Sequence, residues 1–98
     1  MKKSSEKYIE HKLVMAIKEN KGMCIKLICD QFSGLPDRLC LFPNGKVAFV
    51  ELKTTGQKPR LLQTVVHNKL RKLGFTVEVI DSDENINPFI NSILNKEQ

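Results

Sequence analysis

The chain has 98 residues, 41% hydrophobic and 28% charged, a composition typical of a soluble globular protein with a single core. We therefore expect one domain over residues 1–98. No apolar run approaches the roughly 20 residues that a membrane helix needs, and the polar start is unlike a signal peptide. The net charge is +5, and Glu51 is the only acid between Arg38 and Lys72. This basic middle indicates a polyanionic partner, either nucleic acid or an anionic membrane surface.

The three cysteines, Cys24, Cys29 and Cys40, have neither a CxxC spacing nor a pairing with histidine. Each lies within an apolar stretch, which favours small reduced core residues over a zinc site or a disulfide framework. Reduced thiols are typical of a reducing compartment, so we expect the protein to be cytoplasmic.

The first half of the chain predicts one helix and three strands. A helix over residues 4–20 has a helically spaced inward stripe of Ile9, Leu13, Ala16 and Ile17, with Ser4 or Ser5 as its cap. A strand over residues 23–29 and a loop over 30–36 follow. Strands over 37–42 and 46–53 flank "PNG", a strong hairpin signal.

The second half predicts a crossover and a return strand. A helix begins at Pro59 and runs to about Leu73, with an inward stripe of Leu62, Val66, Leu70 and Leu73. A strand over 75–81 comes next, and residues 89–96 form a final helix or a partner-facing surface. Residues 88–94 are a candidate dimer surface. The order α-β-β-β-α-β predicts an α/β fold with a mixed central sheet flanked by helices.

Charged residues gather at the open end of the hairpin. Strand alternation places Glu51 and Lys53 on one face, and counting outward from the turn brings Asp37 to the same end. Two neighbouring carboxylates repel unless a cation lies between them, and their hard oxygens suit Mg²⁺ or Mn²⁺. A nearby lysine can orient the attacking water and offset transition-state charge. The alternative is a strand-end salt bridge without chemistry.

Helical residues could complete such a site. Glu10 borders the first inward stripe and could reach the sheet surface, and Glu6, one turn earlier, is the competing candidate. Gln63 borders the second stripe, where an amide could hold a water or a phosphate. His67, one turn later, lies further round the helix towards solvent. Nothing near it in the sequence would orient it, so we expect a surface or phosphate-contacting histidine rather than a catalytic base. Candidate phosphate contacts are Lys26 (alternatively a sheet-edge residue), Lys58, Arg60, His67 and Arg71.

Together these residues match the motif of a known nuclease superfamily. Glu10, "GLPD" ending in Asp37, "VELK" with Glu51 and Lys53, and Gln63 resemble the PD-(D/E)XK nucleases. More narrowly, "GLPDRLCLFPNGKVAFVELK" and "LRKLGFTVEVID" are similar to the virus-type replication-repair nuclease (VRR-NUC) family, whose compact stand-alone members occur in phages and prophages. The resemblance covers about residues 6–81 and implies a restriction-endonuclease-like core.

The resemblance also implies roles for individual residues. Asp37, Glu51 and the main-chain carbonyl of Leu52 would bind a divalent metal, Mg²⁺ or Mn²⁺, with Glu10 binding it directly or through water. Lys53 would be the catalytic lysine, and Gln63 would lie near the metal or the phosphate.

The implied activity is that of a metal-dependent DNA endonuclease. The family resembles archaeal Holliday junction resolvases in fold, which implies a homodimer cleaving branched or structured DNA in the cytoplasm of a bacterial host. Two alternatives stay open: a non-catalytic DNA-binding or assembly module acting with a replication partner, and a purely structural domain.

Overall fold

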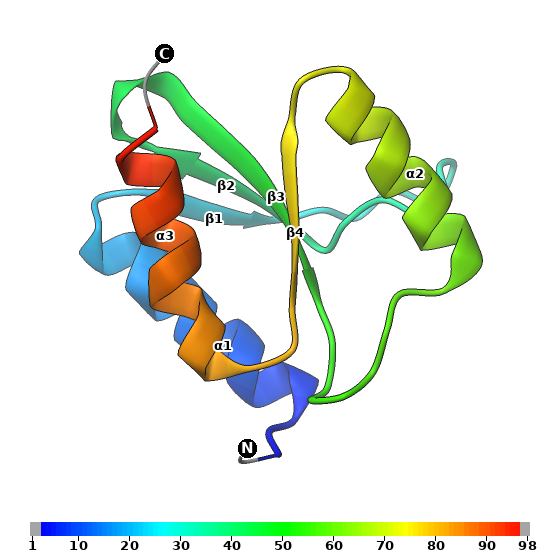
Figure 1. Cartoon of the computed structure of the whole chain (residues 1–98), viewed down its shortest axis with the longest axis horizontal. Helices are drawn as coiled ribbons and strands as arrows, with labels where there is room; N and C mark the ends of the chain where they lie inside the picture. Colours follow the sequence, from blue (N-terminus) through cyan, green and yellow to red (C-terminus); the bar gives the residue numbers. More distant parts are fainter. Residues whose placement is uncertain (1–2, 97–98) are drawn as a thin grey trace.

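The computed structural model describes residues 3–96, which form a four-stranded sheet and three α-helices (Figure 1). The helices are α1 (Glu6–Glu19), α2 (Leu61–Lys72) and α3 (Ile86–Leu94). The strands are β1 (Met23–Lys26), β2 (Arg38–Phe42), β3 (Lys46–Leu52) and β4 (Thr76–Ile80), with short 3-10 turns at Pro43–Gly45 and Asp83–Asn85. Within residues 3–96, no helix has the length and apolar character needed to cross a membrane.

The sheet order is β1-β2-β3-β4, and the β1–β2 and β2–β3 pairs are antiparallel. Strand β4 pairs parallel with β3, because α2 carries the chain back to the other end of the sheet before β4 begins. Helices α1 and α3 cover one face, and α2 lies on the other (Figure 1). The predicted α/β fold with a mixed, helix-flanked sheet is confirmed.

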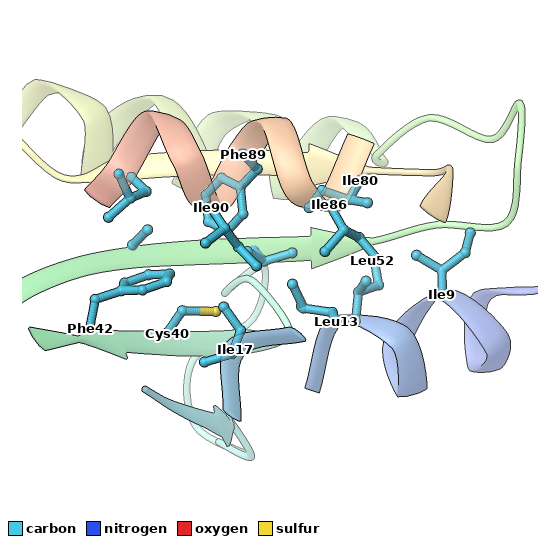
Figure 2. Packing of buried hydrophobic residues seen from close by; sticks show 13 residues of the cluster. Ile9, Leu13, Ile17, Cys40, Phe42, Leu52, Ile80, Ile86, Phe89 and Ile90 are labelled. Atoms are coloured by element: carbon cyan, nitrogen blue, oxygen red, sulfur yellow. The ribbon is translucent and has the colours of Figure 1, made fainter. Parts of the chain in front are cut away.

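The hydrophobic core lies between the sheet and the layer of α1 and α3. Ile9, Leu13 and Ile17 of α1 are each 0% exposed, as their helical spacing predicts. Every second residue of β2 and β3 faces this layer, because strand side chains alternate between faces. Figure 2 shows side chains from α1, β2 and α3 meeting there. The strand side of the core comprises Cys40, Phe42, Ala48, Val50, Leu52 and Ile80.

The turn between β2 and β3 fixes the register of the hairpin. Asn44 and Gly45 both adopt positive φ, 67° and 73°. Tight hairpin turns favour Asn-Gly because both central residues must enter this left-handed region. The turn pairs Phe42 with Lys46, and the ladder then continues outward to Arg38 opposite Val50.

Several predicted boundaries are wrong, and the final helix begins at Ile86 rather than at residue 89. Strand β1 ends at Lys26 rather than Cys29, because the chain leaves the sheet after Leu27, whose N–H donates to the Asp37 carbonyl at 2.9 Å. Cys29 is therefore exposed rather than a core residue. Helix α2 begins at Leu61, two residues after Pro59, because the intervening residue is extended.

The C-terminal segment is a core helix. Ile86, Phe89, Ile90 and Ile93 of α3 are all at most 4% exposed and belong to the same core as α1. The alternative of a partner-facing surface, and with it the candidate dimer surface over 88–94, is wrong for these apolar side chains. These side chains of α3 already pack against the sheet of the same chain.

We expect Leu13→Ala to lower the free energy of unfolding by about 2–5 kcal/mol, because it leaves a cavity in the core. Met15 lies on the same helix and is 47% exposed, so Met15→Ala should change stability by less than about 1 kcal/mol. Urea denaturation measures both variants. Equal losses would contradict the packing of α1 against the sheet.

Candidate active site

The β2–β3 register brings two carboxylates together. The β2–β3 ladder ends at the Arg38–Val50 pair, and Asp37 and Glu51 are the next residues outward on the two segments. The charge of Asp37 acts on Glu51, so the two carboxylates are neighbours. Asp37 Oδ2 accepts a hydrogen bond from the Leu52 N–H at 2.8 Å, so the backbone of β3 holds this carboxylate at the strand end.

Glu51 is almost fully buried, with its side chain 1% exposed. Its Oε2 atom accepts from Gln63 Nε2 at 2.9 Å and lies 3.3 Å from Lys53 Nζ. Its Oε1 atom lies 3.7 Å from His67 Nε2, beyond hydrogen-bond distance. Among residues 3–96, neither Glu51 Oε1 nor His67 Nε2 has a hydrogen-bond partner. Gln63 and Lys53 thus both contact Glu51 Oε2, whereas Glu51 Oε1 has no hydrogen-bond partner within residues 3–96.

Burial and neighbouring charge shift the protonation of both groups. Burial, followed by the negative charge of Asp37, raises the pKa of Glu51 to about 7, although Lys53 opposes the shift. Burial also lowers the pKa of His67, with Arg71 adding to the effect. Near neutral pH the imidazole is therefore neutral, and Glu51 is only partly ionised unless more positive charge reaches it.

Gln63 links the start of α2 to this carboxylate. Its side-chain carbonyl accepts from the Arg60 N–H at 2.9 Å, while its amide nitrogen donates to Glu51. One side chain therefore satisfies a free N–H at the helix start and also orients the acid.

The inward face of α2 differs from the predicted stripe. Val66 is buried as expected, but Leu62 and Leu73 are 53% and 74% exposed, and the other buried residues are Gln63 and His67. The expectation that His67 points towards solvent is wrong, since its side chain is 1% exposed. The buried carboxylate gives this face polar partners, so the helix turns polar groups inward.

The loop before Asp37 packs closely on α2. A Cβ atom at Gly34 would lie 2.8 Å from Val66 Cγ2, and Gly34 has a φ of +93°. Both the left-handed backbone and the lack of a side chain are therefore needed at this point. The close approach places the loop that delivers Asp37 against the helix that delivers Gln63.

The two candidate acids of α1 have different surroundings. Glu10 Oε2 lies 3.0 Å from Arg38 Nη2 and accepts from Arg38 Nε at 3.1 Å, on the opposite sheet face from Asp37. The charge of Glu6, in contrast, adds to the raised pKa of Glu51. Within residues 3–96, no three Asp, Glu, His or Cys side chains form a group that could hold a metal. The structure thus leaves Glu10 away from the carboxylate pair.

The predicted phosphate contacts are spread over the molecule. Lys26 pairs in register with Arg38 and so lies on the α1 face. Arg71 donates to the Val77 carbonyl at 2.8 Å, which ties α2 to β4. Lys58 and Arg60 are both exposed and lie shortly before Gln63, in the segment that leads into α2.

Comparison with known proteins assigns the chain to a family, although no family model matches the sequence. A curated protein named "Putative nuclease p44", from Acyrthosiphon pisum secondary endosymbiont phage 1, is 40% identical over 79 residues, covering 81% of this chain and 85% of p44. A solved structure described as "VRR_NUC domain" matches with a TM-score of 0.84 and 28% identity over 90% of this chain and 97% of that one. The chain belongs to the virus-type replication-repair nuclease family.

Membership of the VRR-NUC family makes the chain a nuclease and implies, in general, the use of a divalent metal. The residues fit such an ion. Asp37 and Glu51 repel each other, the pKa of Glu51 is raised, and its Oε1 has no hydrogen-bond partner within residues 3–96. A cation between the two carboxylates would relieve all three conditions.

Sequence reasoning missed the contact between His67 and Glu51. The signal was present, because Gln63 and His67 are four residues apart and therefore share one helix face. Once Gln63 is assigned to the site, that spacing turns His67 inward as well.

We expect the metal-free protein to lose stability as pH rises from about 5 to 7. The pKa of Glu51 is near 7 in the fold and 4.5 ordinarily, so the folded state binds the extra proton in this window. Each pH unit then removes about 1.4 kcal/mol at most. His67 acts oppositely below its ordinary pKa of 6.5, so the comparison needs a matched variant.

Glu51→Gln is that variant, because it keeps an acceptor for Gln63 and cannot titrate. Urea denaturation in chelator, at several pH values, gives the difference between the two proteins. The free energy of unfolding of the wild type should fall relative to that of Glu51→Gln as pH rises from about 5 to 7. A difference between the two proteins that does not change with pH would contradict the raised pKa of Glu51.

Proposed function

We propose that this chain, as a single domain over residues 1–98, is a divalent-metal-dependent DNA endonuclease that hydrolyses phosphodiester bonds. The observation that carries the proposal is the buried Glu51, facing Asp37 and lying 3.3 Å from Lys53. An isolated strand-end salt bridge would be solvated, whereas this carboxylate is 1% exposed and lies beside a second acid. Such burial of like charges is characteristic of a site built for a cation.

Asp37, Glu51 and the main-chain carbonyl of Leu52 would hold the cation, Mg²⁺ or Mn²⁺, since all three offer hard oxygen ligands. Bound there, the ion would supply Lewis-acid stabilisation of phosphoryl charge and activation of water. Glu6 is the better of the two α1 candidates for completing the site, because Glu10 is already paired with Arg38.

The remaining side chains would orient the Glu51 carboxylate and offset the negative charge of the phosphate. Lys53 is partly exposed, at 16%, so its ammonium can reach a phosphate while staying beside Glu51, and we propose it as the catalytic lysine. Gln63 would hold the Glu51 carboxylate in its orientation. His67 would close the inner wall of the site, since it is too buried for the phosphate contact that its sequence position suggested.

Lys58 and Arg60 would hold the DNA backbone next to the site. Such contacts to phosphates are independent of base sequence, so the shape of the DNA would select the substrate. We propose branched or structured DNA, Holliday junctions among them, cleaved by a homodimer in the cytoplasm of a bacterial host during phage replication, recombination or repair. The phage origin of p44 supports this setting.

Asp37→Ala and Lys53→Ala should each lower cleavage at least about 100-fold, because one removes a cation ligand and the other a transition-state charge. Lys18→Ala, at an exposed position on the last turn of α1, is the control and should cleave normally. The assay uses labelled branched and linear DNAs with Mg²⁺, Mn²⁺ or chelator.

Unchanged cleavage by both variants would contradict the proposed site. DNA binding without metal-dependent cleavage in the wild type would instead indicate the non-catalytic binding module.

Glu6→Gln and Glu10→Gln should separate the two α1 acids. Glu6→Gln should weaken Mn²⁺ binding by roughly 10-fold, as loss of a supporting carboxylate does, with little change in stability. Glu10→Gln should lower stability by about 1 kcal/mol, because Arg38 loses its charged partner, and should leave Mn²⁺ affinity unchanged. Calorimetric titration and urea denaturation measure the two quantities. The reverse pattern would assign the site to Glu10.

A further inference from the structure

Two cysteines face each other across the β1–β2 ladder. Cys24 and Cys40 are directly opposite in the antiparallel register, so their side chains leave the same sheet face. Opposed residues in such a pair have Cα atoms about 4.5–5.5 Å apart, within the roughly 4.4–6.8 Å that disulfides span. Cys40 is fully buried, and Figure 2 shows its sulfur beside Ile17. Cys24 is half-buried and packs at the rim of the same core.

The two thiols are chemically unequal. A hydrogen bond from the Cys40 thiol lowers the pKa of Cys24, and the Arg38 charge helps. The same hydrogen bond, together with burial, raises the pKa of Cys40. Cys24 is thus the better nucleophile and also the more accessible sulfur, while Cys40 stands behind it. This is the arrangement of an attacking and a resolving cysteine.

We propose that Cys24 and Cys40 form a cross-strand dithiol site that a small-molecule disulfide converts into an intramolecular disulfide. The Cys24 thiolate attacks one sulfur of the oxidant, forming a mixed disulfide and releasing the first small thiol. Cys40 then attacks the Cys24 sulfur. The second small thiol leaves and takes up the Cys40 proton. The protein loses two hydrogens and two electrons, which reduce the oxidant to two thiols.

The bond would enclose the segment that delivers Asp37. Residues 25–39 lie between the two cysteines, and they include the loop that packs on α2 through Gly34. Arg38 also donates to the Cys24 carbonyl at 3.3 Å, so the cysteine pair lies within one hydrogen bond of the residue after Asp37. In a reducing cytoplasm the bond would be transient rather than structural. The proposal rests on the β1–β2 pairing and is independent of nuclease activity.

Thiol counting on the full-length chain tests the proposal, with oxidised glutathione as the probe. After the folded protein has been treated, alkylation in denaturant should count one free thiol in place of three, and the linked peptides should contain Cys24 and Cys40. Cys29→Ser is the matched control, because Cys29 is exposed and outside the ladder. It should form the bond at a rate within about twofold of the wild type, since the attacking and resolving thiols are unchanged.

Cys24→Ser should stop internal bond formation entirely, and its half-buried position makes it a mild replacement if Cys40→Ser fails to fold. Persistence of three free thiols in the wild type would overturn the proposal. So would a bond that joins Cys29 to either partner, or a product that links two chains.

Discussion

The register of the β2–β3 hairpin is the constraint on which the rest of the site depends. Asn44 and Gly45 set it by entering the left-handed region together, and the ladder then carries Asp37 opposite Glu51 at the far end. Since strand side chains alternate, a slip of one residue would move Glu51 into the apolar layer beneath α1 and α3. The buried acid and the hydrophobic core therefore depend on the same turn.

The buried carboxylate in turn determines how α2 packs. An acid on this face needs donors, and Gln63 supplies one while also bonding the start of its own helix. His67 follows one turn later and fills the remaining space. The donors offset only part of the unfavourable burial, since the pKa of Glu51 stays near 7. The buried face of α2 is thus polar because it packs on Glu51 of the sheet. Additional positive charge near Glu51 would stabilise its ionised form.

Strand geometry made the sheet side of the site predictable, because alternation and counting from a tight turn leave few choices. Asp37 and Glu51 could be paired from the sequence in this way. The helix side was less predictable. Predicting the buried face of α2 from its apolar residues assumes that the sheet surface beneath it is apolar. The buried Glu51 makes that surface polar, so Leu62 is exposed and His67 is buried. The choice between Glu6 and Glu10 depends on how α1 lies across the sheet, which no local pattern encodes.

Asp37 is the residue just before β2, and Arg38 is the first residue of the strand. Asp37 belongs to the carboxylate pair beneath α2, while Arg38 holds Glu10 of α1 on the other side. A single peptide unit thus couples the two layers of the molecule. The Glu10–Arg38 ion pair therefore ties the first helix to the residue next to an acid of the carboxylate pair.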